Sequence, residues 1–204
     1  MKPRTLFVKP PDPFLDNEFV YQQLAPHYLQ SWLNVHGYES ALLVLYVRPR
    51  ADGTRPPPKR LADCHMLLVE DGQPLLDAPF DSAVFAGFDL IAQSVMTPQA
   101  EYARWVTAAV RREQPRARVM LGGSHARYYL EQVVNERGLE ACDYVVPHDG
   151  WQPLLEVLEA GLPDRGRGHV MSHQHDLSEI TMAPTRPEEL MARYRYEIAG
   201  LPAF

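Results

Sequence analysis

Cysteine, long apolar runs and surplus basic charge are all scarce in this chain of 204 residues. Its two cysteines, Cys64 and Cys142, form neither a disulfide framework nor a zinc motif, and they suit a reducing cytoplasm. No apolar stretch reaches the roughly 18 residues that a membrane-spanning helix needs, and residues 1–4 lead into a short strand rather than a signal peptide. With 20 basic against 26 acidic residues the net charge is −6, which argues against a nucleic-acid-binding surface.

The motifs that mark several large classes of enzyme are also absent. No Gly-x-Gly-x-x-Gly follows the first predicted strand, and neither a phosphate-binding Gly-x4-Gly-Lys-Ser/Thr loop nor a Gly-x-Ser-x-Gly turn occurs. Neither cysteine lies in a local pattern that would activate its thiol. The sequence therefore predicts no standard dinucleotide, nucleoside-triphosphate or acyl-transfer site.

What the sequence does contain is an alternation of apolar strand-like runs and amphipathic helices. Such an alternation predicts an α/β fold with a doubly wound parallel sheet, whose ligands bind beyond the carboxyl ends of the strands. The linking segment at 48–60 is rich in proline and charge and is expected to be a surface loop. We expect strands at 5–8, 40–47, 64–70 (an excursion), 82–87, 118–121 and 143–146, and helices at 18–36, 98–112, 126–136 and 151–160.

The character of the chain changes after residue 163. Residues 164–204 are expected to be irregular, apart from a helix at 187–196. The spacing of His173 and His175, with His169 nearby, is compatible with zinc binding. No further ligands can be named, so solvated histidines in a linker are the alternative.

The most informative stretch is an apolar run, residues 119–121, that breaks at Gly122 and Gly123 and restarts as a helix. Adjacent glycines at a strand-to-helix junction allow a sharp turn and let a ligand approach the bare backbone. Ser124 either bonds such a ligand or only caps the helix, and His125 is expected at the start of the helix or on the surface.

Four segments together resemble a known family. They are Val8-Lys9-Pro10-Pro11, Phe85-Ala86-Gly87-Phe88-Asp89, Val119-Met120-Leu121-Gly122-Gly123-Ser124-His125-Ala126 and Asp143-Tyr144-Val145-Val146. In this order and at these spacings they resemble the N-terminal cobalamin-binding domain of cobalamin-dependent radical-SAM enzymes. The resemblance implies a Rossmann-like cobalamin-binding domain at residues 1–163, and residues 164–204 resemble the linker into a radical-SAM domain. The Cys-x3-Cys-x2-Cys motif of that domain is absent from the sequence.

The resemblance also assigns candidate residues on the first loop. Related free-standing domains carry Asp-x-His-x-x-Gly there, with a His beneath cobalt. Here the frame runs from Asp12 to Asn17, after Pro11, with Phe14 in the place of the His. The resemblance therefore implies binding without a protein imidazole from this loop; a simple proline-rich turn is the alternative.

Three further candidate groups follow from the same resemblance. Phe88, Asp89 and Ile91 are expected where related domains place Ser-x-Leu beside the nucleotide tail, although Asp89 could instead only cap the next segment. Gly122 and Gly123, with Ser124 and His125, are expected to meet the dimethylbenzimidazole. The last group consists of Val146, His148 and Gly150, in a loop that departs from the Gly-Glu-Gly of the family.

The expected function is thus cobalamin binding as the cofactor module of a radical-SAM protein. In such a protein a 4Fe-4S cluster and S-adenosylmethionine would act with cobalamin in methyl transfer, and the partner would be the radical-SAM catalytic domain. Two alternatives remain open. One is a stand-alone domain that senses or delivers cobalamin, and the other is a doubly wound domain that binds a nucleotide or flavin, or no ligand.

Overall fold

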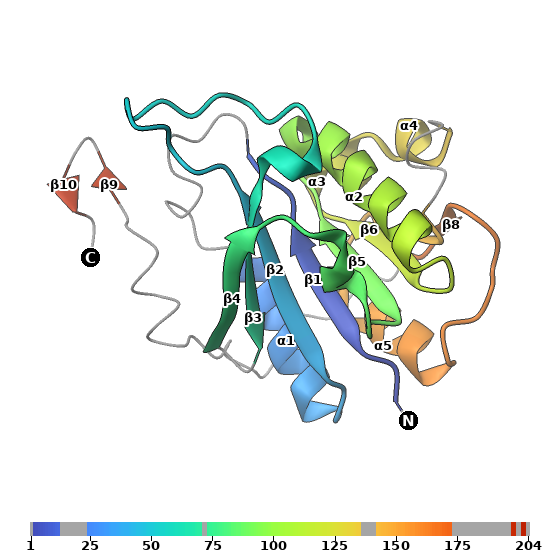
Figure 1. Cartoon of the computed structure of the whole chain (residues 1–204). Helices are drawn as coiled ribbons and strands as arrows, with labels where there is room; N and C mark the ends of the chain where they lie inside the picture. The colour runs from blue at the N-terminus through green and yellow to red at the C-terminus, as the bar shows by residue number, and fades with distance from the viewer. Residues whose placement is uncertain are drawn as a thin grey trace.

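A computed structural model describes residues 2–12, 24–70, 73–135, 142–172, 197–198 and 201–202. Its centre is an eight-stranded sheet in the order β4-β3-β2-β1-β5-β6-β7-β8 (Figure 1). Neighbouring strands along the series β2-β1-β5-β6-β7-β8 pair in parallel. The strands β3 and β4 add an antiparallel hairpin beside β2. The strands are β1 Thr5–Lys9, β2 Ser40–Tyr46, β3 His65–Glu70, β4 Gln73–Pro79, β5 Leu90–Ser94, β6 Arg118–Gly122, β7 Tyr144–Val145 and β8 His169–Val170. A separate pair joins β9 Glu197–Ile198 to β10 Leu201–Pro202.

Helices cover both faces of the sheet, as a doubly wound fold requires. Helices α1 (Leu24–Val35) and α5 (Trp151–Glu159) pack on one face, while α2 (Ala100–Glu113), α3 (Ser124–Tyr128) and α4 (Leu130–Asn135) pack on the other (Figure 1). The described residues also form three short 3-10 helices: η1 (Leu61–Asp63), η2 (Ser82–Phe85) and η3 (Thr97–Gln99).

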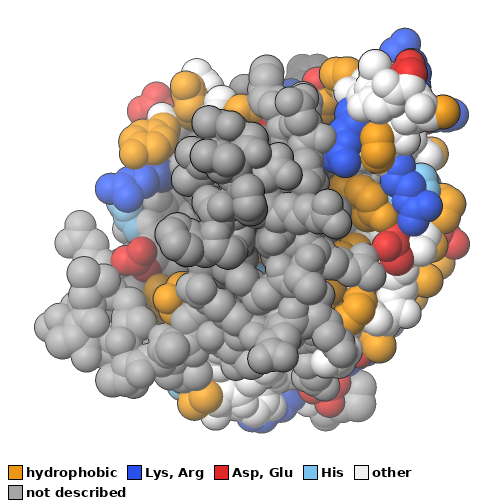
Figure 2. All heavy atoms as spheres, turned by 90° about the vertical axis from the view of Figure 1, so that its left-hand side faces the viewer, with side chains coloured by type: hydrophobic (Ala, Val, Ile, Leu, Met, Phe, Trp, Pro, Cys, Tyr) orange, Lys and Arg blue, Asp and Glu red, His pale blue; other side chains and the backbone are white. Residues whose placement is uncertain are grey.

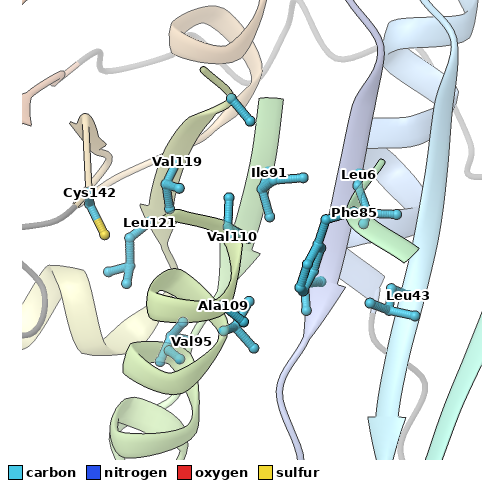
Figure 3. Close-up of a cluster of buried hydrophobic side chains, with 14 of the residues drawn as sticks. Leu6, Leu43, Phe85, Ile91, Val95, Ala109, Val110, Val119, Leu121 and Cys142 are labelled. Atoms are coloured by element: carbon cyan, nitrogen blue, oxygen red, sulfur yellow. The ribbon is translucent and has the colours of Figure 1, made fainter. Parts of the chain in front are cut away.

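The side chains of each central strand alternate between two hydrophobic cores. In β1, Leu6 and Val8 belong to the core under α2, whereas Phe7 belongs to the core under α1 and α5. The period of two residues is the geometry of a strand buried on both sides. Figure 3 shows the α2 core, where Ile91 of β5 and Val119 and Leu121 of β6 face the helix.

The predicted fold class is confirmed, and most predicted elements exist within a few residues of their expected limits. The clearest error is the strand expected at 82–87. Those residues form η2 and a turn at Gly87, whose φ of 83° suits glycine. The strand of this region is β5, Leu90–Ser94, which follows the apolar residues of 82–87.

Smaller differences have local causes. The helix expected at 126–136 begins at Ser124 and is interrupted at Tyr129. Pro26 lies in the first turn of the described part of α1, Leu24–Val35, where a missing N–H is tolerated. The short strand β8 extends the sheet within a segment that was expected to be irregular.

The predicted helix at 187–196 lies outside the described residues, as do the first residues of the helix expected at 18–36. Among the helices that the structure describes, none has the length and apolar character needed to cross a membrane. Neither Cys64 nor Cys142 forms a disulfide and both are buried; burial raises the pKa of the Cys142 thiol to about 12. At neutral pH that thiol is protonated and is not a nucleophile.

Candidate functional site

A cleft opens at the carboxyl ends of β1, β5, β6 and β7. The chain leaves β1 toward β2 on one side, whereas β5 continues the sheet on the other, so β1 and β5 flank the topological switch point. The cleft lies between the sheet and the helices α1 and α5, and its cavity volume is about 380 Å³. That volume is within the range of small-molecule sites.

The cleft exists because the strands present small residues at this end. On the α1 and α5 face, β5 carries Leu90 deep in the sheet and then Ala92 and Ser94 toward its end. On the same face β6 carries Met120 and then Gly122. The loss of side-chain volume toward the edge leaves room that the helices do not fill.

Apolar and aromatic side chains form the walls of the cleft. Helix α1 contributes Tyr28 and Leu29, and α5 contributes Trp151 and Leu154. The rings of Tyr28 and Trp151 meet edge to face, with centroids 5.7 Å apart and planes at 70°. The site thus combines a flat, bare floor with an aromatic wall, an arrangement that suits a planar heterocycle.

Few polar groups face the cleft. The polar side chains among its described lining residues are those of Tyr28, Gln93, Ser94, His148 and Asp149, and no Lys or Arg is among them. The amide of Gln93 lies on the other face of the sheet, where Nε2 donates to Oγ1 of Thr107 at 2.9 Å. The N-terminus of α5, at Gly150 and Trp151, also lies at the cleft. This electrostatic setting favours a neutral or singly charged ligand over one with several negative charges.

The two glycines of the β6 turn have different roles. Gly122 has room for a Cβ, which would meet the carbonyl oxygen of Val146 at 3.5 Å. Gly123 has a φ of 91°, and a Cβ there would lie 2.6 Å from the backbone nitrogen of Val95. Both glycines line the cleft, but the fold itself requires the second one because the turn packs directly on the β5 loop.

Hydrogen bonds fix this contact between the two loops. The backbone N–H of Val95 donates to the carbonyl oxygen of Gly122 at 2.9 Å, and the N–H of His125 donates to the carbonyl oxygen of Val95 at 2.9 Å. One side of the cleft is therefore preorganised by backbone bonds, which lowers the entropy lost when a ligand binds.

Ser124 and His125 are not among the residues that line the cleft. Ser124 is exposed at the start of α3, and Gly123 rather than Ser124 holds the position before the helix. His125 is buried on the α2 side, with Nδ1 3.4 Å from Oγ1 of Thr97 in η3 and its ring 5.4 Å from that of Tyr129. Burial lowers the pKa of His125, and the Arg104 guanidinium lowers it further.

Phe88, Asp89 and Ile91 are not among the described residues that line the cleft, contrary to their expected place at the ligand edge. Phe88 and Asp89 precede β5 at its amino end, where a carboxylate oxygen of Asp89 accepts the backbone N–H of Arg4 at 2.9 Å. Ile91 is fully buried in the α2 core. The carboxyl end of β5 is instead at Ser94, and Ser94 lines the cleft.

The remaining candidates divide into two groups. Val146, His148 and Gly150 line the cleft with Gly122 and Gly123, and their contact with a cofactor stays a prediction. Pro11 and Asp12 are buried after β1, but they are not among the described lining residues. The position of Phe14 lies outside the described residues.

The sequence pattern does not identify several residues of the floor and of the aromatic wall of the cleft. Ala92 and Ser94 are not identified because the sequence pattern places the strand at 82–87, ahead of β5. Tyr28 and Trp151 are ordinary positions of amphipathic helices in the sequence, and only the packing of α1 beside α5 brings their rings together.

No metal centre is found within the described parts of the chain, which contain no group of three His, Cys, Asp or Glu side chains placed to hold an ion. His169 begins β8, with Nε2 3.5 Å from Nη1 of Arg165. His173 and His175 lie outside the described residues.

The fold is a doubly wound α/β domain with a cleft at its switch point, the place where such folds bind ligands. Residues 62–158, just under half of the chain, match the family model described as the B12 binding domain. The matched segment runs from η1 to α5 and includes β5, β6 and β7, three of the four strands at the cleft. No curated protein and no solved structure matches the chain.

Proposed function

We propose that this chain binds cobalamin, with the nucleotide tail of the cofactor in the cleft and the corrin outside it. The observation that carries the proposal is the coincidence of the family match with the cleft: residues 62–158 supply Ala92, Ser94, Gly122 and Trp151, which build its floor and aromatic wall. The sequence resemblance supports the same ligand from motifs on both sides of the switch point.

The chemistry of the cleft residues fits the tail. A dimethylbenzimidazole is flat and apolar, so it suits the small-residue floor and the rings of Tyr28 and Trp151. The tail phosphodiester carries one negative charge, and Ser94 and the first N–H groups of α5 are suitable donors for it. The lack of Lys and Arg among the described lining residues makes a flavin phosphate or a nucleoside polyphosphate the weaker alternative.

We further propose the His-off mode, in which no imidazole from the loop after β1 reaches cobalt, because Phe14 occupies that place in the sequence frame. When bound, cobalamin supplies a cobalt centre that can accept and give up a methyl group. The residues of this chain would bind and orient the cofactor and shield its tail from water.

The parent protein in this proposal is a cobalamin-dependent radical-SAM methyltransferase. Residues 1–163 would be its cofactor domain and 164–204 the linker to a catalytic domain that holds a 4Fe-4S cluster and S-adenosylmethionine. The support is the sequence resemblance over the first 163 residues. Two buried thiols that form no disulfide support a reducing compartment such as the cytoplasm. The alternative within the same ligand class is a stand-alone domain that senses or delivers cobalamin.

A desalting experiment tests the ligand. The protein is mixed with hydroxocobalamin, passed through a desalting column and examined by visible absorption, with flavin mononucleotide as a parallel probe. We expect cobalamin absorption, and no flavin absorption, to elute with the protein. Quenching of tryptophan fluorescence should accompany binding because Trp151 lies at the cleft. Retention of flavin alone, or of neither probe, would overturn the proposal.

Electron paramagnetic resonance of the cob(II)alamin complex tests the His-off mode separately. The spectrum should show no superhyperfine splitting from an axial nitrogen. Phe14→His should introduce such splitting, and Phe14→Leu should not, since only the imidazole can donate a nitrogen lone pair. Nitrogen splitting in the unmodified protein would contradict the His-off mode while leaving cobalamin binding intact.

A further inference from the structure

A second hollow lies on the opposite face of the molecule from the ligand cleft. It is bounded by α2, by η1 and by the segment from Pro79 to Ser82, and its volume is about 750 Å³. Its residues belong to the α2 side of the sheet, so the proposed cobalamin cleft does not use them. We call it the α2 hollow.

The floor and one wall of the α2 hollow are apolar. Leu61 and Ala109 are buried at its base, while Phe80 and Trp105 are partly buried against the α2 core. Trp105 is held in place by Tyr102, whose ring it meets edge to face at 5.1 Å and 88°. A fixed tryptophan beside a phenylalanine is the kind of anchoring pocket found at the centre of protein interfaces.

Basic side chains surround this apolar base. Lys59, Arg60 and Arg112 line the hollow, whereas Asp81 is the one acidic residue among the described lining residues, and its carboxylate accepts the backbone N–H of Ala83. The surplus of positive charge is local, since the chain as a whole carries a net charge of −6. Figure 2 shows Lys and Arg side chains beside hydrophobic ones at its right-hand edge, the side of the molecule that faces the viewer in Figure 1.

The basic groups remain available to a ligand. Arg60 pairs with Asp63 at 3.1 Å and Arg112 with Glu113 at 2.8 Å, but both arginines are exposed and such surface pairs contribute little. The Lys59 ammonium has no carboxylate partner among the described residues; its backbone N–H donates to Asp63. Incoming carboxylates can therefore compete for all three cations.

From this combination of an aromatic base and a basic rim we propose that the α2 hollow binds an acidic peptide segment of a partner protein, with an aromatic side chain of the peptide anchored between Phe80 and Trp105. Complementary charge would select acidic partners and speed their association, and the aromatic anchor would supply contact area. The proposal does not depend on cobalamin binding.

The probe for this site is a fluorescein-labelled peptide that alternates glutamate with phenylalanine. Matched peptides carry lysine for glutamate or alanine for phenylalanine. In fluorescence anisotropy the first peptide should bind, with an affinity that falls as salt increases, and both matched peptides should bind more weakly. No saturable binding of the first peptide, or equal binding of the lysine peptide, would overturn the proposal.

Variants locate the binding. The double variant Lys59→Glu/Arg112→Glu should lower the affinity for the peptide about tenfold or more, and Trp105→Ala should lower it by a similar factor. The control Arg116→Glu/Arg167→Glu reverses two exposed cations outside the hollow and should leave the affinity unchanged. Circular dichroism checks that each variant is folded. Equal loss in the control would mean that only overall charge matters and would contradict the proposed site.

Discussion

The two edges of the same sheet differ in how they are built. At the carboxyl edge the strands end in Ala92, Ser94 and Gly122, and a cleft without Lys or Arg among its described lining residues remains open between the helices. At the amino edge the corresponding ends are closed by ion pairs that tie strands and helices together. The contrast teaches that the amino edge stabilises the fold, whereas the carboxyl edge is packed less tightly and leaves room for a ligand.

Asp143 shows how the amino edge is closed. Its carboxylate accepts hydrogen bonds from Arg111 at 2.6 Å, from Arg118 at 3.0 Å and from the backbone N–H of Val119 at 2.7 Å. The side chain is only 8% exposed. One carboxylate thus joins α2, β6 and the start of β7, and the Asp of the Asp-Tyr-Val-Val motif has a structural rather than a ligand-binding position.

The largest loss of stability should follow from removal of the Asp143 carboxylate. Asp143→Asn should lower the free energy of unfolding by about 3 kcal/mol, at the low end for a broken buried ion pair because both arginines keep some contact with water. Urea denaturation measures the loss. Asp164→Asn, at an exposed partner of Arg118, is the matched control and should change stability little. Cobalamin affinity of the folded Asp143→Asn protein should be unchanged; a large loss of affinity would mean that the two edges are not independent.

The next effect separates the two glycines of the carboxyl edge. Gly123→Ala should destabilise the protein by about 2 kcal/mol, since alanine disfavours a φ of 91° and its Cβ would collide with the backbone of Val95. Gly122→Ala should be nearly neutral because its Cβ has ordinary contacts. Thermal denaturation of the two variants compares them directly. Similar stability for both would show that the β5 and β6 loops are not packed as tightly as described.

The smallest expected effect is a pH dependence of the protein's stability that arises from His125, near the carboxyl edge of the sheet. The pKa of His125 in the folded protein is lowered from 6.5 by burial and by Arg104, so the unfolded chain takes up the proton first as the pH falls. The stabilising contribution is present above the unfolded pKa and is lost as the pH drops below it. Stability measured between about pH 7.5 and about pH 5.5 should therefore decline less steeply in His125→Gln than in the unmodified protein. An unchanged slope would contradict a buried, neutral imidazole.

The sequence predicted the alternation of the fold because each strand and helix carries its own hydrophobic period. It also located Gly122, Gly123, Val146, His148 and Gly150, since strand ends and turn glycines are local signals. It misplaced the strand at 82–87 because an apolar 3-10 turn with Phe85 in the core looks like a strand when only hydrophobicity is considered.

The rest of the site depends on contacts that have no local signal. The contact of Tyr28 with Trp151 joins two helices, α1 and α5, that are far apart in the sequence. The requirement for glycine at position 123 arises from Val95, which lies in a different loop. The α2 hollow likewise combines residues from η1, α2 and the segment after β4. Such juxtapositions follow from tertiary packing rather than from any one segment.

The most direct test of the central claim is a titration of hydroxocobalamin into two matched variants. Ala92→Phe places a ring on the floor of the cleft, whereas Ala108→Phe places the same ring on the exposed surface of α2. Ser94→Leu provides a second, half-exposed cleft position in case Ala92→Phe does not fold. We predict that Ala108→Phe binds as the unmodified protein does, and that the folded cleft variants bind about a hundredfold more weakly. Undiminished binding by a folded cleft variant would contradict the claim that cobalamin occupies the carboxyl edge of this sheet.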